Sequence, residues 1–319
     1  MKRSMRVLVF THMYPTTKNP AWGIFVQQQV ESLIREGVQV EVLHIDTTKS
    51  KWLYLWSFLP LIIKAYKEKY DLVHAHYVFA GLVARSQFRT PIVVTHHGDE
   101  ALLGWQSPLC WLVSRLVDKT IAVSQPIKDA INLPGTAVIP CGVDFDLFKP
   151  MDQSEARIAL GLPQEKKLIL FVGDISKSLK RADLVQDTVS YLQSQGKKVD
   201  LVIAYKQPYQ TIPLYMNACD VMVLPSEREG SPQVVKEAMA CNLPIIVSDV
   251  GDVKDVIAGV ENCFICKRDV MDIAEKITVV LQNPCRTNGR EMTSRYELSA
   301  IAKRIISVYE EVTRKKHIT

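Results

Sequence analysis

The sequence predicts an α/β fold of two Rossmann-like domains, and three observations lead to this prediction. Short apolar segments typical of buried strands alternate with segments of helical period along the whole chain, which indicates parallel sheets joined by crossover helices. The alternation pauses at residues 148–151 and then begins again. The length of 319 residues, with 47% hydrophobic and 23% charged residues, suits two medium-sized soluble domains.

The first domain, residues 1–150, is expected to begin with a strand at residues 7–11 and a helix at residues 24–35. That helix places Val26, Val30 and Leu33 on one apolar face. Further apolar segments are expected to be strands of the same sheet, at residues 39–45, 72–74, 91–95, 120–123 and 137–140.

The second domain, residues 151–298, repeats the scheme. Its expected strands lie at residues 168–172, 199–204, 220–224, 244–248 and 263–266. Helices are expected between them at residues 182–193, 232–240 and 270–282. A last helix, residues 299–319, carries a one-sided apolar stripe and must therefore pack on another element.

Composition excludes some partners and favours others. The net charge is +5, and the basic excess lies mainly in the first half of the chain. This bias is too weak for nucleic-acid binding, but it suits an anionic membrane surface or a phosphorylated acceptor. Seven cysteines without a signal peptide, and no apolar stretch of the ~18–20 residues that a transmembrane helix needs, predict a cytoplasmic protein.

The segment from Glu229 to Glu237 carries the clearest chemical signal. It follows an apolar strand at residues 221–225 and starts a helix, with Ser231 expected as the N-cap and Pro232 as the first helical residue. A helix that begins there directs N–H groups and a positive dipole end at the strand edge, where a diphosphate would bind. Carboxylates accept hydrogen bonds from sugar hydroxyls, so the pattern indicates a nucleotide-sugar site. A capped surface helix with two solvated glutamates is the alternative.

The same segment resembles the E-x7-E signature of the family 4 retaining glycosyltransferases. The matching stretches are residues 225–232 and 237–244, and the similarity extends over nearly the whole chain. The resemblance implies the GT-B fold, in which two Rossmann-like domains face a central cleft. It also implies that the first domain is the acceptor side, that the second binds the nucleotide-sugar, and that the helix at residues 299–319 crosses back to the first domain.

The resemblance gives roles to residues at both ends of the signature. Glu229 is expected to bind hydroxyls of the donor sugar, assisted by the backbone of Gly230 and Ser231. Glu237 is expected to bind the ribose hydroxyls. The other expected donor contacts at the helix start are Pro232, Gln233 and Val234.

Two residues of the first domain also match the family. Gly23 ends a long loop after the first strand and would let the backbone approach the diphosphate and the acceptor. His97 matches the histidine that contacts the donor sugar. From the residues alone, an ordinary surface loop and a structural histidine are the alternatives. Retention in this family is attributed to front-face attack, in which the leaving phosphate takes the acceptor proton, so no side-chain base is expected.

The expected diphosphate loop departs from the family at one position. Lys180 matches the family lysine, whereas Asp174 stands where the family usually has an arginine, and a carboxylate facing a diphosphate repels it. Either Asp174 turns away, or Lys177 or Arg181 supplies the second positive charge. The chain is also short between residues 205 and 215, where typical members have a strand and a helix that help hold the base.

No metal is predicted. Asp144 and Asp146 form an Asp-x-Asp pattern that binds metal in another glycosyltransferase fold, but this segment resembles the interdomain stretch of the present family. The histidines within residues 74–97 lack the spacing of zinc ligands. Cys263 and Cys266 fall on an expected strand, where cysteine behaves as a small hydrophobic residue.

Residues 52–69 are strongly apolar and aromatic and are flanked by lysines. Two interpretations stay open. The segment could lie in a membrane interface, with aromatic rings at headgroup level and lysines on phosphates. It could instead be a core-packed helix whose lysines extend to solvent. Because the family often uses lipid-linked acceptors, we expect peripheral membrane contact.

The resemblance therefore implies a retaining hexosyltransferase of the bacterial polysaccharide-assembly, teichuronic-acid type. The expected donor is UDP- or GDP-linked, no other cofactor is expected, and the acceptor is a saccharide or lipid-linked. The reaction is expected in the cytoplasm, at the inner face of the plasma membrane. The alternative is a catalytically weak homologue that acts as a binding or scaffolding partner, an idea suggested by Asp174 and the short second domain.

Overall fold

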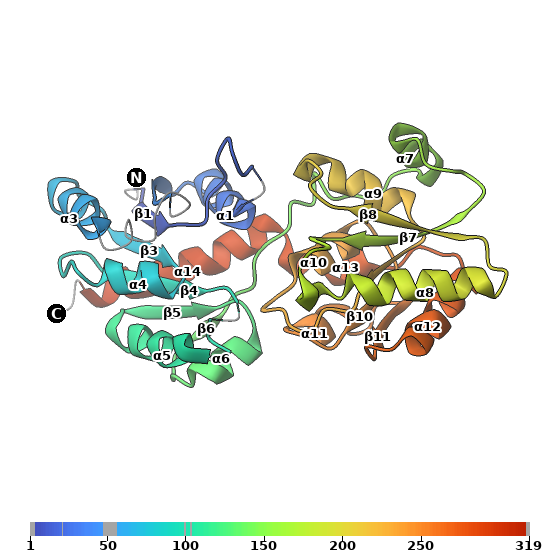
Figure 1. The fold of residues 1–319 in the computed structure, drawn as a ribbon. Coiled ribbons are helices and arrows are strands. Elements are labelled where there is room, and N and C mark those ends of the chain that lie inside the picture. Colours follow the sequence, from blue (N-terminus) through green and yellow to red (C-terminus); the bar gives the residue numbers. More distant parts are fainter. Residues whose placement is uncertain (1–3, 21, 47–55, 99, 103, 317–319) are drawn as a thin grey trace. The chain divides into compact units, whose positions relative to one another are not determined.

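The computed structural model describes residues 4–20, 22–46, 56–98, 100–102 and 104–316 (Figure 1). The chain divides into two compact units, residues 1–142 with 298–319, and residues 143–297. The expected boundary at residue 150 lies slightly further along the chain. Residues 143–150 pack with the second unit because Val143, Phe145 and Phe148 are buried in its core and the Val143 N–H donates to the Tyr296 carbonyl at 2.8 Å.

The first unit is built on a six-stranded sheet with the order β2-β1-β3-β4-β5-β6, in which all neighbouring strands are parallel. This confirms the predicted α/β class. The chain order reverses between β1 and β3, so the loops that follow these two strands flank the switch point of the sheet. The strands are β1 Arg6–Thr11, β2 Gln39–His44, β3 Leu72–His76, β4 Ile92–His96, β5 Lys119–Ala122 and β6 Ala137–Val138.

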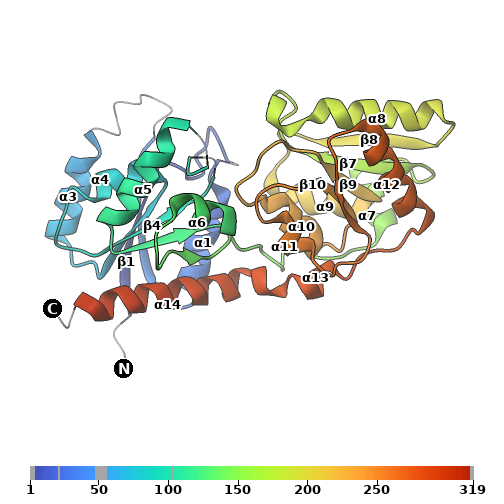
Figure 2. The same cartoon turned by 90° about the horizontal axis from the view of Figure 1, so that it is seen from below.

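Helices cover both faces of this sheet because its strands are apolar on both sides. Leu8 and Phe10 of β1 pack into one core cluster, while Val7 and Val9 pack into another on the opposite face. The first cluster lies under α3 Phe58–Lys67, α4 Val78–Ala84, α5 Ser107–Leu116 and α6 Gln125–Ile131. The second lies under α1 Ile24–Arg35 and the C-terminal helix α14 Leu298–Lys316, which run beside each other (Figure 2).

The C-terminal helix is tied to the sheet of the first unit by a buried polar contact. The Tyr309 hydroxyl of α14 lies 2.6 Å from His74 Nδ1 on β3, and His74 Nε2 lies 2.7 Å from the Thr95 hydroxyl on β4. All three side chains are buried. His74 therefore has a structural role, since both of its ring nitrogens are bonded within the core.

The second unit has a five-stranded sheet with the order β11-β10-β9-β7-β8, again with parallel neighbours. Its switch point lies between β7 and β9. The strands are β7 Lys167–Val172, β8 Val199–Ala204, β9 Val221–Leu224, β10 Ile245–Ser248 and β11 Cys263–Cys266. The helices are α7 Gln153–Leu160, α8 Ala182–Ser194, α9 Ile212–Ala218, α10 Gln233–Ala240, α11 Val253–Ile257, α12 Val270–Gln282 and α13 Gly289–Met292.

The two cysteines of β11 pack on opposite faces of this sheet. Cys266 belongs to the core cluster under α8 and α12, whereas Cys263 packs against the cluster that contains α10. Burial raises the pKa of both thiols to about 12, so both stay protonated at neutral pH. They act as small apolar residues of the strand, as the sequence indicates.

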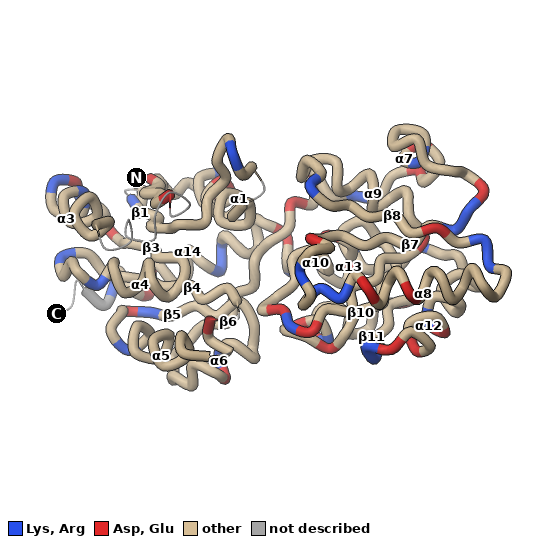
Figure 3. Tube along the Cα trace, in the orientation of Figure 1, with Lys and Arg blue, Asp and Glu red and all other residues tan. Residues whose placement is uncertain are grey.

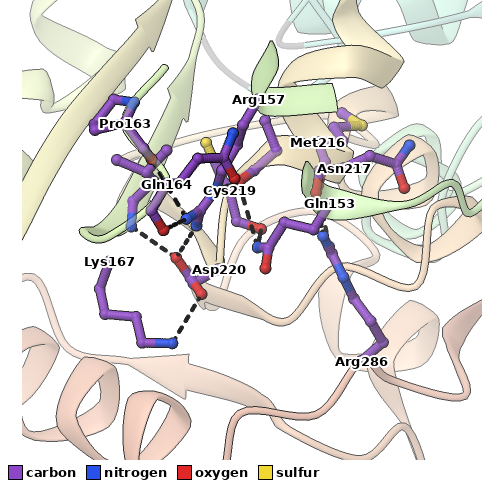
Figure 4. Close-up of polar contacts among 12 residues, drawn as sticks. Gln153, Arg157, Pro163, Gln164, Lys167, Met216, Asn217, Cys219, Asp220 and Arg286 are labelled. Atoms are coloured by element: carbon purple, nitrogen blue, oxygen red, sulfur yellow. Dashed lines mark hydrogen bonds and ion pairs between the residues drawn. The ribbon is translucent and has the colours of Figure 1, made fainter. Parts of the chain in front are cut away.

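A buried charge network joins α7, α9 and the beginning of β9 at the amino-terminal edge of the second sheet (Figure 4). The Arg157 guanidinium donates to Asp220 Oδ2 at 2.9 Å and to the Ala218 carbonyl at 2.9 Å. Arg286 donates to the carbonyls of Met216 and Asn217. These arginines satisfy carbonyls that the end of α9 leaves without helical partners.

Candidate active site

The loops after β7 and β9 bring an ion pair to the switch point of the second sheet. Lys180 ends the short 3-10 turn Ser178–Lys180 after β7, and Glu229 follows β9. Lys180 Nζ lies 2.5 Å from Glu229 Oε1. The Glu227 N–H donates to the Leu179 carbonyl at 2.8 Å, which joins the backbones of the two loops. The Lys180 and Glu229 side chains are partly buried, at 26% and 15% exposure.

The start of α10 differs from the sequence-based expectation. Pro232, not Ser231, occupies the N-cap position, and no side chain of the described residues caps the helix. The Ser231 hydroxyl is bonded elsewhere, since its oxygen accepts from Lys236 and its proton is donated to Asp252 Oδ2 at 2.7 Å. Gln233 and Val234 form the first turn of α10, so the positive end of its dipole lies beside Gly230 and Ser231.

Glu237 lies in the second turn of α10 and is almost completely buried. The Tyr209 hydroxyl donates to its Oε1 at 2.7 Å. Tyr209 belongs to the 3-10 turn Tyr209–Thr211, which occupies the short segment after β8. Burial raises the pKa of Glu237 to about 7, and the Tyr209 hydrogen bond and the Lys236 charge act in the opposite direction. The carboxyl group thus titrates near neutral pH.

Glu237→Gln is expected to stabilise the protein most at high pH. Between pH ~4.5 and ~7 the native protein binds more protons at Glu237 than the unfolded chain does, so its stability falls as the pH rises. Glutamine keeps an acceptor for Tyr209 but does not titrate. The stability gain of the variant should grow from near zero below pH ~4.5 to at most about 3 kcal/mol above pH ~7. Urea unfolding of both proteins below pH ~4.5 and above pH ~7 measures this gain in stability. A gain that is the same at both ends of the pH range would contradict the raised pKa of Glu237.

Asp174 turns away from Lys180 and onto its own loop. Its Oδ1 accepts from the backbone N–H of Ser176 at 3.0 Å and from the Ser176 hydroxyl at 2.6 Å. These hydrogen bonds lower the pKa of Asp174, which stays ionised. Of the two open alternatives for a helper cation, Arg181 pairs with Asp183 and Glu227, whereas the Lys177 side chain is exposed.

In the first unit, Gly23 sits where no other residue fits. It has φ +72°, and a Cβ on it would lie 2.3 Å from the carbonyl carbon of Met13 and 2.6 Å from Tyr14 N. The loop after β1 therefore packs directly on the start of α1. This close approach is a constraint that only glycine satisfies.

His97 follows β4 and is held by other rings. Its Nε2 lies 2.8 Å from His76 Nδ1, its Nδ1 lies 3.6 Å from Cys141 Sγ, and its ring stacks on Tyr77. Burial lowers the pKa of His97 well below its usual value, with further lowering by His76 and other nearby histidines. His97 is therefore neutral at physiological pH. His97 and Gly23 belong to the first unit and form one group of candidate residues, whereas Lys180 and its neighbours form another in the second unit.

Within the described part of the chain, no three His, Cys, Asp or Glu side chains are grouped so that they could hold a metal ion. Sequence reasoning missed three residues that contact the candidates: Tyr209, Lys236 and Asp252. Lys236 lies between the two glutamates of the signature, and its position in an otherwise apolar stretch is the signal that could have been noticed. The other two come from loops whose pairing depends on the folded sheet.

Two family models of glycosyltransferases match separate parts of the chain. The family model of Glycosyltransferase Family 4 matches residues 1–147, and the model of Glycosyl transferases group 1 matches residues 204–299. A relative from Bacillus subtilis, named as the glycosyltransferase TuaC of teichuronic acid biosynthesis, is 24% identical over 86% of this chain and 88% of its own length.

Two solved structures share the fold. Sucrose-phosphate synthase from Thermosynechococcus elongatus has a TM-score of 0.80 at 21% identity and covers 98% of this chain and 100% of its own. Anabaena HepE, solved in complex with UDP and glucose, has a TM-score of 0.76 at 18% identity over 96% of this chain and 100% of its own.

Proposed function

Because the chain belongs to the glycosyltransferases that these two family models describe and has the GT-B fold, we propose that it is a retaining hexosyltransferase. It takes a sugar from a nucleotide-diphosphate donor and passes it to a saccharide or lipid-linked acceptor in cell-surface polysaccharide biosynthesis. The observation that carries the proposal is the Lys180–Glu229 pair beside the start of α10. It places a cation, a helix dipole and a carboxylate at one switch point.

Each group has a distinct task in the proposed reaction. Lys180 and the positive end of α10 stabilise the negative charge that grows on the diphosphate as the bond between sugar carbon and phosphate oxygen breaks. Glu229 accepts hydrogen bonds from the donor sugar, and Glu237 binds the ribose hydroxyls. The acceptor oxygen forms its bond on the same face, and its proton passes to the leaving phosphate oxygen. His97, neutral and fixed by His76, contacts the sugar as a hydrogen-bonding group rather than as a charge.

The donor is proposed to be UDP- or GDP-linked. The complex of HepE with UDP and glucose supports a uracil nucleotide for a chain of this fold, and the name of TuaC supports a role in polysaccharide synthesis. A scaffolding role gains no support, because Asp174 bonds to Ser176 of its own loop, Lys180 pairs with Glu229, and Glu237 accepts from Tyr209. None of the seven cysteines, all of which the structure describes, forms a disulfide bond, which fits a reaction in the reducing cytoplasm.

Thermal-shift binding to UDP, GDP, ADP and dTDP and to their common sugar conjugates tests the proposal. We expect one base to raise the melting temperature, because a ligand that binds only the native state stabilises it. Glu237→Ala, which removes the ribose contact, should lose that shift. Flat curves for the wild type across the whole panel would contradict the donor site and favour the scaffolding alternative.

A membrane contact forms the second part of the proposal. Among the described helices, none is both long and apolar enough to cross a bilayer. Residues 52–55 lie outside the described residues, but α3 beyond them has two faces. Leu61 and Ala65 are buried in the core, whereas Ile63 and Tyr66 are about half exposed. The buried face of the helix fits the interpretation as a core-packed helix, and the exposed apolar face fits the interpretation as a membrane contact.

The exposed face of α3 continues over its neighbours. Helices α3, α4 and α5 lie next to each other on one face of the sheet (Figure 1). Large exposed apolar side chains occur on these helices and on the segments beside them, and we call this set the α3–α5 surface: Phe58, Leu59, Ile63, Tyr66, Leu82, Phe88, Trp105, Trp111, Leu112 and Leu116.

Arginines stack on three of these rings. Arg85 lies over Phe88 at 4.2 Å, Arg115 over Trp111 at 4.9 Å, and Arg89 over Tyr66 at 5.9 Å from the ring centroid. Figure 3 also shows Lys and Arg residues on α3 and at the end of α4. Aromatic rings interleaved with cations suit the headgroup region of an anionic membrane. We place this surface on the inner face of the plasma membrane.

Replacing Arg85, Arg89 and Arg115 together by Gln is expected to lower binding to vesicles that contain phosphatidylglycerol by about 100-fold, since each basic residue near such a surface contributes about 1 kcal/mol. All five tryptophans belong to the first unit, so a blue shift of their fluorescence reports the contact.

The matched control replaces three exposed lysines of the second unit, Lys197, Lys198 and Lys267, by Gln. This change removes the same charge and should leave vesicle binding nearly intact. If the two triple variants bind equally well, or if the wild type ignores anionic vesicles, the membrane contact is wrong.

A further inference from the structure

Lys236 is a charged residue with no role in the reaction described above, and it is completely buried. It lies on α10 between Glu229 and Glu237, and its relative exposure is 0%. Its Nζ lies 3.1 Å from Asp252 Oδ2, and the Asp252 side chain is 8% exposed. On another side Nζ faces the Tyr296 ring at 5.5 Å. A cation in the first half of a helix opposes the dipole, so Asp252 is needed to compensate its charge.

Both members of this ion pair form hydrogen bonds with the Ser231 hydroxyl. The hydroxyl has one proton, which it donates to Asp252 Oδ2 at 2.7 Å, and it accepts a hydrogen bond from Lys236 Nζ. One side chain thus links the loop after β9 to both members of the ion pair. Only the backbone N–H of Ser231 is left to donate a hydrogen bond to a ligand, because its single hydroxyl proton is already used.

Gly251, the residue before Asp252, packs against the backbone of the loop that contains Ser231. Its φ is +58°, and a Cβ would lie 2.7 Å from the Gly230 carbonyl oxygen and 3.0 Å from the Glu229 carbonyl oxygen. The loop after β10 therefore packs directly against residues 229–230. Ser231 is fixed through its side chain and the two residues before it through this backbone contact.

Stability does not explain a buried ion pair at this place. Exchanging such a pair for apolar side chains of similar volume is often neutral or stabilising, since burial of two charges costs about as much as their attraction returns. The geometric consequence is specific instead. The pair determines which way the Ser231 side chain turns, and thereby how the backbone of Glu229, Gly230 and Ser231 is presented at the start of α10.

We propose that Lys236 and Asp252 are positioning residues, which hold the sugar-binding loop 229–231 through the Ser231 hydroxyl. The proposal rests on the proposed function for the identity of the ligand. The orientation of the loop is a property of the protein alone. Ser231 serves the donor through its backbone N–H, and Lys236 acts on the donor only through this loop.

The test is the double variant Lys236→Met/Asp252→Leu, in which both charges are removed together. Hydrogen–deuterium exchange of the peptide that spans residues 227–235, without any ligand, is expected to become at least about tenfold faster. Urea unfolding should stay close to that of the wild type. With the UDP-sugar or GDP-sugar that binds the wild type, affinity should fall about tenfold and kcat about 100-fold, since small misplacements at a reacting centre have effects of this size.

Ser231→Ala provides a second route if the double variant does not fold. It removes only the linking hydroxyl, keeps the ion pair, and should accelerate the same exchange by a smaller factor. A folded double variant with wild-type exchange in the loop overturns the proposal, and so does one with faster exchange but unchanged donor affinity and kcat. If the wild type binds no nucleotide-sugar, the proposed function fails, whereas the exchange measurement still decides whether the pair holds the loop.

Discussion

Lys180→Met should lower kcat/KM for sugar transfer by about 10²- to 10³-fold, the loss typical of removing one group that stabilises developing charge. Lys180 is the cation that Glu229 holds at the switch point of the second sheet, at 2.5 Å. Methionine keeps the length of the side chain but leaves Glu229 without its counter-charge beside the donor diphosphate. Loss of attraction and new repulsion act together, so donor affinity should fall as well as kcat.

Lys177→Met is the matched control. Lys177 lies on the same loop, but its side chain is exposed, and exposed charges contribute little. We expect a change in kcat/KM of less than about fivefold. A larger loss would make Lys177 the second diphosphate cation that Asp174 does not supply. An unchanged donor affinity in Lys180→Met would remove Lys180 from the site.

The sequence predicts secondary structure well where local pattern decides it. The strand at 263–266 and the helices at 24–35 and 270–282 begin and end where expected, because apolar period and end signals lie within each segment. The α/β class follows from the same alternation. The GT-B fold required the resemblance, since period alone does not give the order of strands in a sheet.

Side-chain partners far apart in the chain could not be predicted in this way. Ser231 follows the rule for an N-cap, but its hydroxyl oxygen accepts from the charged Lys236 instead of from a backbone N–H of the helix, and its proton is donated to Asp252 from the next loop. Asp174 looked repulsive toward a diphosphate, yet two hydrogen bonds to Ser176 turn it aside. Both outcomes depend on loop geometry that becomes fixed only when neighbouring strands pair.

Asp220→Ala should lower the free energy of unfolding by about 3–5 kcal/mol, the usual loss when one partner of a buried ion pair is removed. Asp220 Oδ2 accepts from Arg157 Nη2 at 2.9 Å and from the Leu168 N–H at 2.7 Å (Figure 4). The Arg157 and Asp220 side chains are 6% and 9% exposed, so solvent cannot replace the lost carboxylate. Because tryptophan fluorescence reports only the first unit, urea unfolding should be followed by far-UV circular dichroism.

Asp200→Ala is the matched control, since Asp200 also forms an ion pair near the amino-terminal end of a strand of this sheet, in its case with Lys166. Its partner Lys166 is 49% exposed, and the pair lies in water, so the loss should stay below about 1 kcal/mol. Both aspartates lie near the amino-terminal edge of the sheet, opposite Lys180 and Glu229. The fraction of Asp220→Ala that remains folded should therefore bind the donor with wild-type affinity. Equal losses of stability in the two variants would mean that Arg157 finds enough compensation in its bonds to carbonyl groups.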